Sequence, residues 1–230
     1  MANINKLKSL TSFMLDVHYK TKLRGSRIIQ TNTDYCECIY SYVYNEIRIF
    51  IAGTDEKFHP GSSDWFGKSG NLNHADVNSD GIHDGFANAY ANLREDIHNC
   101  IEEIANSIVL ANKTHSLKIV VIGYSRGGGI AIPLLMQLKK IYNINISAVL
   151  FGAPPVLDKE AQAKFMTMGI DILRVVNGWD LVSTARVYKK VGLVHVGKQL
   201  TVKQPFWHYL PHKRIDDHRI ENYWRGVHKL

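Results

Sequence analysis

A serine lies between glycines where a β-branched run gives way to a segment of small residues. Residues 119–122 (Ile-Val-Val-Ile) precede Gly123-Tyr124-Ser125-Arg126-Gly127, and two further glycines follow. Because glycine has no Cβ, Gly123 and Gly127 allow a strand and a helix to approach closely around a sharp turn. Such a turn exposes the Ser125 hydroxyl, and the free amides of the helix start favour developing negative charge. The pattern predicts a nucleophilic serine, and the structural alternative is a turn in which Ser125 only caps a helix. The phosphate-loop pattern G-x-x-x-x-G-K-[ST] is absent.

A serine hydroxyl needs a base to take its proton, and the base needs an orienting carboxylate. Asp180 follows the apolar run 173–176 and is the predicted acid, whereas Asp171 precedes this run, at the wrong edge of a sheet. His218 begins a segment with apolar residues at helical spacing and is the predicted base, with His212 as the next alternative. The remaining histidines near the carboxyl terminus are His208 and His228. For each of these histidines, a surface position without catalytic role is the alternative.

Hydrophobic periodicity predicts the elements that must position these groups. We predict helices near 7–17 and at 85–111, 126–141, 159–168 and 216–227. We predict strands at 37–44, 46–52, 117–122, 146–151 and 172–176, and one or two more within 192–202. Alternating strands and helices favour a mainly parallel sheet with helices on both faces, and the serine turn makes this the α/β-hydrolase fold. No linker divides the chain, so residues 1–230 are expected to form one domain.

Composition and charge indicate a globular protein and argue against a nucleic-acid-binding function. The chain has 230 residues, of which 45% are hydrophobic and 21% charged, which is typical of a globular protein. The net charge is +7, and the positive excess lies in residues 116–230. These basic residues are scattered and no nucleic-acid module surrounds them, so we expect a solvated surface with at most weak contact to anionic surfaces.

Targeting signals and disulfides are not evident. The most apolar stretch, 119–136, contains Arg126 and several glycines and does not read as a membrane span. Residues 10–15 are too short and polar for a signal peptide. The odd number of cysteines, three, argues against a disulfide framework, and an intracellular location is therefore expected.

Two segments could hold a metal ion. Residues 76–81 match the start of an EF-hand calcium loop, but the twelfth position is Ala87, where a bidentate Glu is needed. The same residues are ordinary turn formers, and we favour a turn. The low-ranked calcium ligands would be Asp76, Asn78 and Asp80. Cys36 and Cys38 share one face of a strand, but without further ligands they are expected to be buried thiols.

From about residue 49 onward the chain resembles the class 3 (fungal-type) triacylglycerol lipases, through six ordered blocks. These are 49–54 (Ile-Phe-Ile-Ala-Gly-Thr) with Asp-Trp at 64–65, 82–86 (Ile-His-Asp-Gly-Phe), 123–128 around the serine, 150–154 (Leu-Phe-Gly-Ala-Pro), 174–180 (Arg-Val-Val-Asn-Gly-Trp-Asp), and 217–218 (Asp-His) with Tyr223 beyond. The resemblance implies an ester or lipid substrate, possible phospholipase activity and no cofactor. It also implies a triad of Ser125, Asp180 and His218, and an oxyanion hole formed by the amides of Thr54 and Arg126.

The departures from the family are specific. The family usually has His before its serine and an apolar residue after it, whereas this chain has Tyr124 and Arg126. The Arg126 side chain is expected to alter the acyl pocket or to bind an anion. Residues 66–81, where family lipases often carry an apolar lid, are polar, which favours soluble or dispersed esters over a lipid surface. An acyltransferase with the same triad, or a non-catalytic lipid- or anion-binding module of this fold, are the alternatives.

Overall fold

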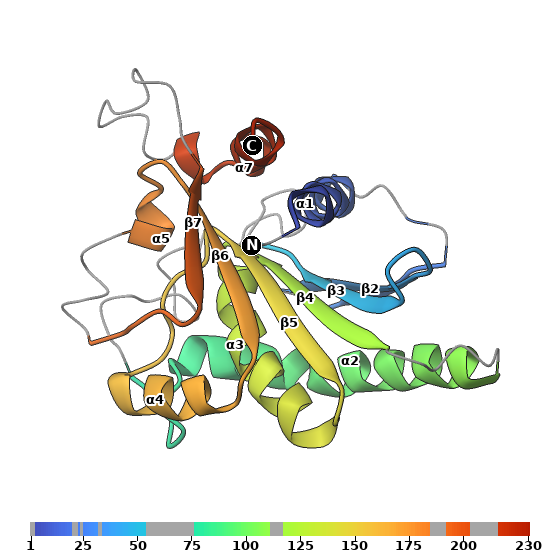
Figure 1. Cartoon of the computed structure of the whole chain (residues 1–230). Coiled ribbons are helices and arrows are strands. Elements are labelled where there is room, and N and C mark those ends of the chain that lie inside the picture. The colour runs from blue at the N-terminus through green and yellow to red at the C-terminus, as the bar shows by residue number, and fades with distance from the viewer. Residues whose placement is uncertain are drawn as a thin grey trace.

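The computed structural model describes residues 3–19, 23, 25–31, 34–53, 76–110, 117–184, 192–202 and 216–230. Within these ranges seven strands form one sheet, in the order β1 to β7 (Figure 1). The strands are β1 (Arg27–Gln30), β2 (Tyr35–Ser41), β3 (Glu46–Ile51), β4 (Lys118–Tyr124), β5 (Asn145–Phe151), β6 (Asp171–Asn177) and β7 (Lys198–Val202). The helices are α1 (Ile4–His18), α2 (Asp84–Leu110), α3 (Arg126–Ile141), α4 (Lys159–Thr167), α5 (Leu181–Thr184), the 3-10 turn η3 (Asp216–His218) and α7 (Ile220–His228).

The sheet has an antiparallel edge and a parallel centre. Strands β1, β2 and β3 pair antiparallel, and the pairs from β3 to β7 are parallel. The carboxyl ends of β4, β5 and β6 therefore meet at one edge, where side chains from distant parts of the chain converge. Ser125, Gly152 and Asp180 follow these three strands, so the predicted fold class is confirmed in the feature that matters for the site.

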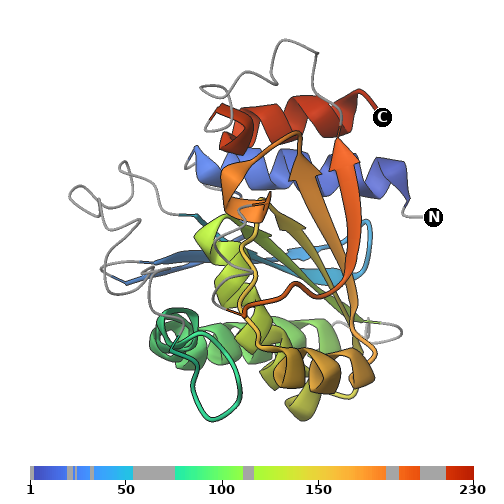
Figure 2. The same ribbon diagram turned by 90° about the vertical axis from the view of Figure 1, so that its left-hand side faces the viewer.

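Helices cover both faces of the sheet because its central strands are apolar on both sides. Ile47, Ile49 and Ile51 of β3 belong to the core beneath α2, α3 and α4, whereas Phe50 belongs to the core beneath α1 and α7. Figure 2 shows α1 and α7 side by side on one face and α2, α3 and α4 on the other. The predicted amphipathic helix at the amino terminus is confirmed, since Leu7 to Val17 of α1 supply its buried stripe.

The two terminal helices are joined by polar contacts as well as by their apolar faces. The Trp224 indole Nε1 of α7 donates to Ser12 Oγ of α1 at 3.3 Å, and Tyr19 donates to the Glu221 carboxylate. Because α7 follows η3 directly, its docking on α1 fixes the segment that carries His218.

Several sequence predictions need correction. Strand β1 was not predicted because it is an edge strand, with Ile29 as its one buried residue and no apolar alternation. Residues 192–202 contain one strand, at 198–202, and the helix predicted from 216 begins at Ile220 after the 3-10 turn. Of the polar flap (66–81), only residues 76–81 are described. His208 and His212 lie outside the described residues.

Two further expectations concern the cysteines and the membrane. Cys36 and Cys38 are buried free thiols, as expected, and Cys100 is a buried free thiol as well. No helix in the described ranges combines the length and the apolarity that a bilayer span requires.

Candidate active site

Ser125 occupies the sharp turn between β4 and α3. Its backbone has φ 53° and ψ −122°, a conformation that side-chain-bearing residues rarely adopt, and its amide donates to the Phe151 carbonyl at 2.8 Å. A strained strand-to-helix turn of this kind aims a nucleophile out of the sheet edge.

The glycines around the serine are required by close backbone contacts. A Cβ on Gly123 would lie 2.6 Å from the Gly128 Cα, so strand and helix nearly touch there, as predicted. A Cβ on Gly127 would lie 2.1 Å from the Ile51 carbonyl oxygen, so this glycine lets α3 approach β3 rather than the strand before the serine. The helix start is thus packed between two neighbouring strands.

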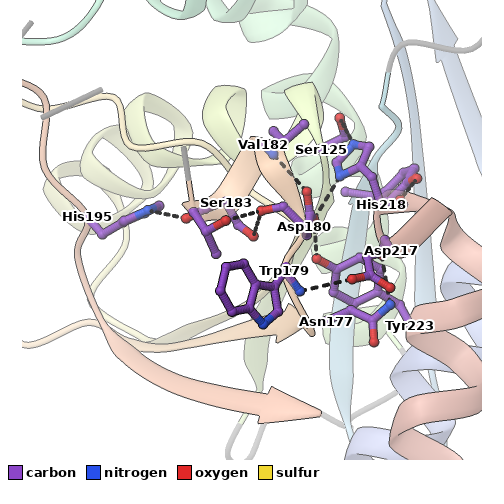
Figure 3. A network of polar contacts seen from close by, with 12 residues as sticks. Ser125, Asn177, Trp179, Asp180, Val182, Ser183, His195, Asp217, His218 and Tyr223 are labelled. Carbon is purple, nitrogen blue, oxygen red and sulfur yellow. Dashed lines mark hydrogen bonds and ion pairs between the residues drawn. The ribbon is translucent and has the colours of Figure 1, made fainter. Parts of the chain in front are cut away.

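Ser125, His218 and Asp180 form a continuous hydrogen-bond chain (Figure 3). The Nε2 atom of His218 lies 2.7 Å from Ser125 Oγ, and its Nδ1 atom lies 2.8 Å from Asp180 Oδ2. Since a carboxylate oxygen only accepts, Nδ1 carries the proton and Nε2 is free to accept the serine proton. The structure therefore brings together the three residues that the sequence selected.

The described alternatives lie elsewhere. Asp171 starts β6 and is exposed at the opposite end of the strand from Asp180. His228 stacks on Trp224 in α7, and its Nδ1 lies 2.9 Å from the Trp224 carbonyl oxygen. His208 and His212 fall outside the described residues.

Asp180 is fully buried and held by several donors. Its Oδ1 accepts from the Val182 amide at 2.8 Å, and its Oδ2 accepts from the Tyr223 hydroxyl as well as from His218. Burial and the adjacent Asp180 charge raise the pKa of Tyr223, so this hydroxyl stays protonated and donates. The carboxylate is thereby locked in the orientation that His218 needs.

A wider network fixes the segments that carry the acid and the base (Figure 3). The Asn177 side chain donates to the Asp217 carbonyl at 2.7 Å, and the Trp179 amide donates to Asp217 Oδ2 at 3.0 Å. These contacts link the end of β6 to η3. They join the residues beside Asp180 to the residue before His218.

His195 supports the same region and was missed in the sequence. Burial, together with the charge of Arg174, lowers the pKa of His195 to about 4, so its ring is neutral. Its Nε2 lies 3.0 Å from the Ser183 carbonyl oxygen, which can only accept, so this nitrogen donates to α5. A histidine far from the motif blocks gives no sequence signal for such a role.

Tyr124, a departure from the family pattern, packs directly against the base. Its ring stacks on the His218 ring at 5.4 Å with an interplanar angle of 20°. Its hydroxyl donates to the His218 carbonyl at 2.5 Å. Tyr124 thus fixes both the ring plane and the backbone of His218.

Gly152 provides space for the acid and the base. It has φ +59°, and a Cβ there would lie 2.8 Å from Asp180 Oδ2 and 3.0 Å from His218 Cε1. The sequence identified Gly152 within a block but gave no reason for it. The structure supplies two, since both the backbone conformation and the space favour glycine.

Of the two predicted oxyanion-hole residues, Arg126 lies within the described part of the chain and Thr54 does not. Arg126 is the first residue of α3, where the helix itself supplies no acceptor for the backbone amides, and its N–H is adjacent to Ser125 in the chain. Its side chain forms an ion pair with the buried Asp34 carboxylate, an anion within the protein. Thr54 lies outside the described residues. The preceding residue, Gly53, passes so close to the nucleophile that a Cβ there would lie 2.9 Å from Ser125 Cβ.

The low-ranked calcium loop has the contacts of a turn. Asn78 Oδ1 accepts from the amides of Asp80 and Ile82, each at 3.0 Å. Among the described residues, which include Asp76, no group of three or more acidic, histidine or cysteine side chains is arranged to hold a metal. The turn interpretation accounts for the contacts that are seen.

The mainly parallel sheet, the serine turn and the Ser125–His218–Asp180 hydrogen-bond chain define the α/β-hydrolase class. The model of the family "Lipase (class 3)" matches residues 49–189, more than half of the sequence. The chain therefore belongs to the class 3 lipase family, which makes it a carboxylic ester hydrolase.

Solved structures of lipases share the fold. The Rhizomucor miehei lipase in its propeptide complex has a TM-score of 0.69 at 18% identity, over 86% of this chain and 68% of that one. The Rhizopus microsporus var. chinensis lipase has a TM-score of 0.68 at 18% identity, over 89% and 77%. A triacylglycerol lipase whose catalytic centre is a serine protease triad has a TM-score of 0.64 at 15% identity, over 94% and 89%. No curated protein sequence matches the chain.

Proposed function

We propose that this protein hydrolyses carboxylic esters through an acyl-enzyme on Ser125. The observation that carries the proposal is the hydrogen-bond chain from Ser125 Oγ through the His218 ring to Asp180. Ser125 Oγ attacks the ester carbonyl carbon while His218 Nε2 takes the hydroxyl proton. The tetrahedral intermediate collapses, and His218 returns this proton to the departing alcohol. A water molecule, deprotonated by His218, then attacks the acyl-enzyme, and the carboxylic acid leaves as Ser125 regains its proton.

The charge that develops on the carbonyl oxygen needs amide donors. We assign this role to the amides of Arg126 and Thr54, the first because it begins α3 next to Ser125 and the second from the family resemblance. One such donor contributes a factor of about 10² to 10³ to turnover.

A fluorophosphonate probe tests the proposal without the natural substrate. Wild-type protein is expected to gain the mass of one adduct, because an activated serine attacks the probe phosphorus. The adduct should map to Ser125 and be absent in Ser125→Ala, as measured by intact-mass and peptide analysis. If folded wild type remains unlabelled, or the adduct persists in Ser125→Ala, the assigned nucleophile is wrong.

We propose further that the substrate is a soluble or dispersed ester rather than a lipid surface. The support is the polar sequence of residues 66–81, which offers little apolar area for burial in a lipid interface. Hydrolysis of a short-chain ester is expected to rise smoothly with its concentration. An abrupt rate increase at the concentration where the ester forms micelles or droplets would contradict this expectation.

A further inference from the structure

A largely buried ion pair joins the residue before β2 to the start of α3. Arg126 and Asp34 form this pair, with side-chain exposures of 15% and 2%. Burial lowers the pKa of Arg126 to about 10, so the guanidinium remains charged at neutral pH. The Arg126 side chain therefore reaches from the residue beside the nucleophile to the antiparallel edge of the sheet.

The first residue of β2, next to Asp34, contacts the chain segment that leads to Thr54. The Tyr35 carbonyl, next to Asp34, accepts from the Ala52 amide at 3.0 Å. Ala52 is followed by Gly53, whose backbone lies beside Ser125, and then by Thr54. Residues 34 and 35 thus touch both chain segments that would supply the two amides.

A charge pair with little solvent contact restricts the positions of its two side chains more than an exposed pair does. Water has little access to the guanidinium, and the buried Asp34 carboxylate loses a strong partner if Arg126 moves. The orientation of the Arg126 residue is thereby coupled to the position of the β2 start. Oxyanion donors act only when they are already aimed at the position of the developing charge.

We propose that Asp34 is a positioning residue for the oxyanion hole. Its carboxylate holds the Arg126 side chain, and the adjacent Tyr35 carbonyl holds the Ala52 amide, so residues 34 and 35 couple the Arg126 residue to the end of β3 beside Ser125. The proposal rests on the ester-hydrolase function above, in which the Arg126 amide stabilises the tetrahedral intermediate. Asp34 itself touches no reacting atom.

The structure offers a matched control in Glu46. This carboxylate is also fully buried in ion pairs, with Lys6 at 2.6 Å and Arg48 at 2.9 Å. It begins β3, at the end of the sheet opposite the candidate site. Asp34→Asn and Glu46→Gln therefore remove the same kind of interaction, and only the first touches the oxyanion segments.

The test compares kcat, KM and inhibition by a trifluoromethyl ketone, which binds serine hydrolases as a tetrahedral oxyanion. For Asp34→Asn we expect kcat to fall about 10- to 100-fold with KM nearly unchanged, because one donor is misaligned rather than deleted. Affinity for the ketone should fall by the same factor as kcat/KM. Glu46→Gln should change the melting temperature but leave both kcat and the affinity for the ketone unchanged. Equal losses in the two variants would reduce the pair to a structural role and overturn the proposal.

A double-mutant cycle guards against unfolding as an explanation. Arg126→Lys keeps the charge but alters the geometry, and we expect it to lower kcat with the melting temperature retained. Asp34→Asn combined with Arg126→Lys should be little worse than either single change, since both disturb one interaction. Additive losses, or an unchanged kcat in Arg126→Lys, would contradict the proposal. These outcomes can be distinguished from failure of the proposed ester-hydrolase function. If that function is wrong, wild-type protein will neither turn over esters nor be labelled at Ser125.

Discussion

Replacing Asp180 with Asn is expected to lower kcat by about 10⁴-fold while the protein stays folded. Three donors now converge on the carboxylate, namely the His218 Nδ1–H, the Tyr223 hydroxyl and the Val182 amide. Asn has one oxygen and one NH₂ group. If the NH₂ group faces His218, Nδ1 must become the acceptor, the proton moves to Nε2, and Nε2 can no longer accept from Ser125. If it faces Val182, two donors oppose each other in a buried site.

Steady-state kinetics on a soluble ester, with circular dichroism to check folding, measures this effect. Asp171→Asn is the matched control, because the carboxyl group that it removes lies at the other end of β6. We expect the control to retain wild-type kcat. A folded Asp180→Asn protein with a tenth or more of wild-type activity would place the acid elsewhere.

Replacing Gly152 with Ala should lower kcat by about 10²-fold or more. The new methyl group would lie 2.8 Å from Asp180 Oδ2 and 3.0 Å from His218 Cε1, so one of these groups must move. A displacement of about 1 Å within a catalytic arrangement can cost this factor. Kinetics on the same ester, with thermal melting alongside, reports both activity and stability.

Gly169 separates backbone strain from the steric effect. Its φ is +66°, close to the +59° of Gly152, but a Cβ there would meet no atom within 4 Å. Gly169→Ala should therefore destabilise the fold by a similar backbone cost of about 1 kcal/mol and leave kcat intact. If both variants lose activity to the same extent, the contact with the acid and base is not the cause.

The sequence predicted those parts of the site that depend on local pattern. Ser125 stands out because a strand-to-helix turn requires small residues on both sides, and Asp180 because it follows an apolar strand. His218 was selected from several histidines by the apolar spacing behind it. The helix ends at Arg126 and Ile141 were predicted correctly, since the turn and the apolar stripe both mark them.

What the sequence did not predict depends on contacts between distant segments. Three such features arise only when the strands lie side by side. They are the ion pair between Asp34 and Arg126, the donor role of His195 and the space kept by Gly152. Strand β1 has little apolar pattern because it lies at the sheet edge. The oxyanion role of Thr54 and the preference for soluble esters remain predictions, because they depend on residues between 54 and 75.

The strand order has a consequence for how the protein folds. Each strand from β2 to β7 pairs with the one before it in the chain, so the sheet can extend progressively as a nascent chain lengthens. The nucleophile turn can then form as soon as β3, β4 and β5 have paired. His218 comes after β7 in the chain, and α7 behind it docks on α1, which precedes β1. The serine thus exists without its base until η3 and α7 have been made and α7 has docked on α1, so chemical competence arises only after strands β1 to β7 have been made.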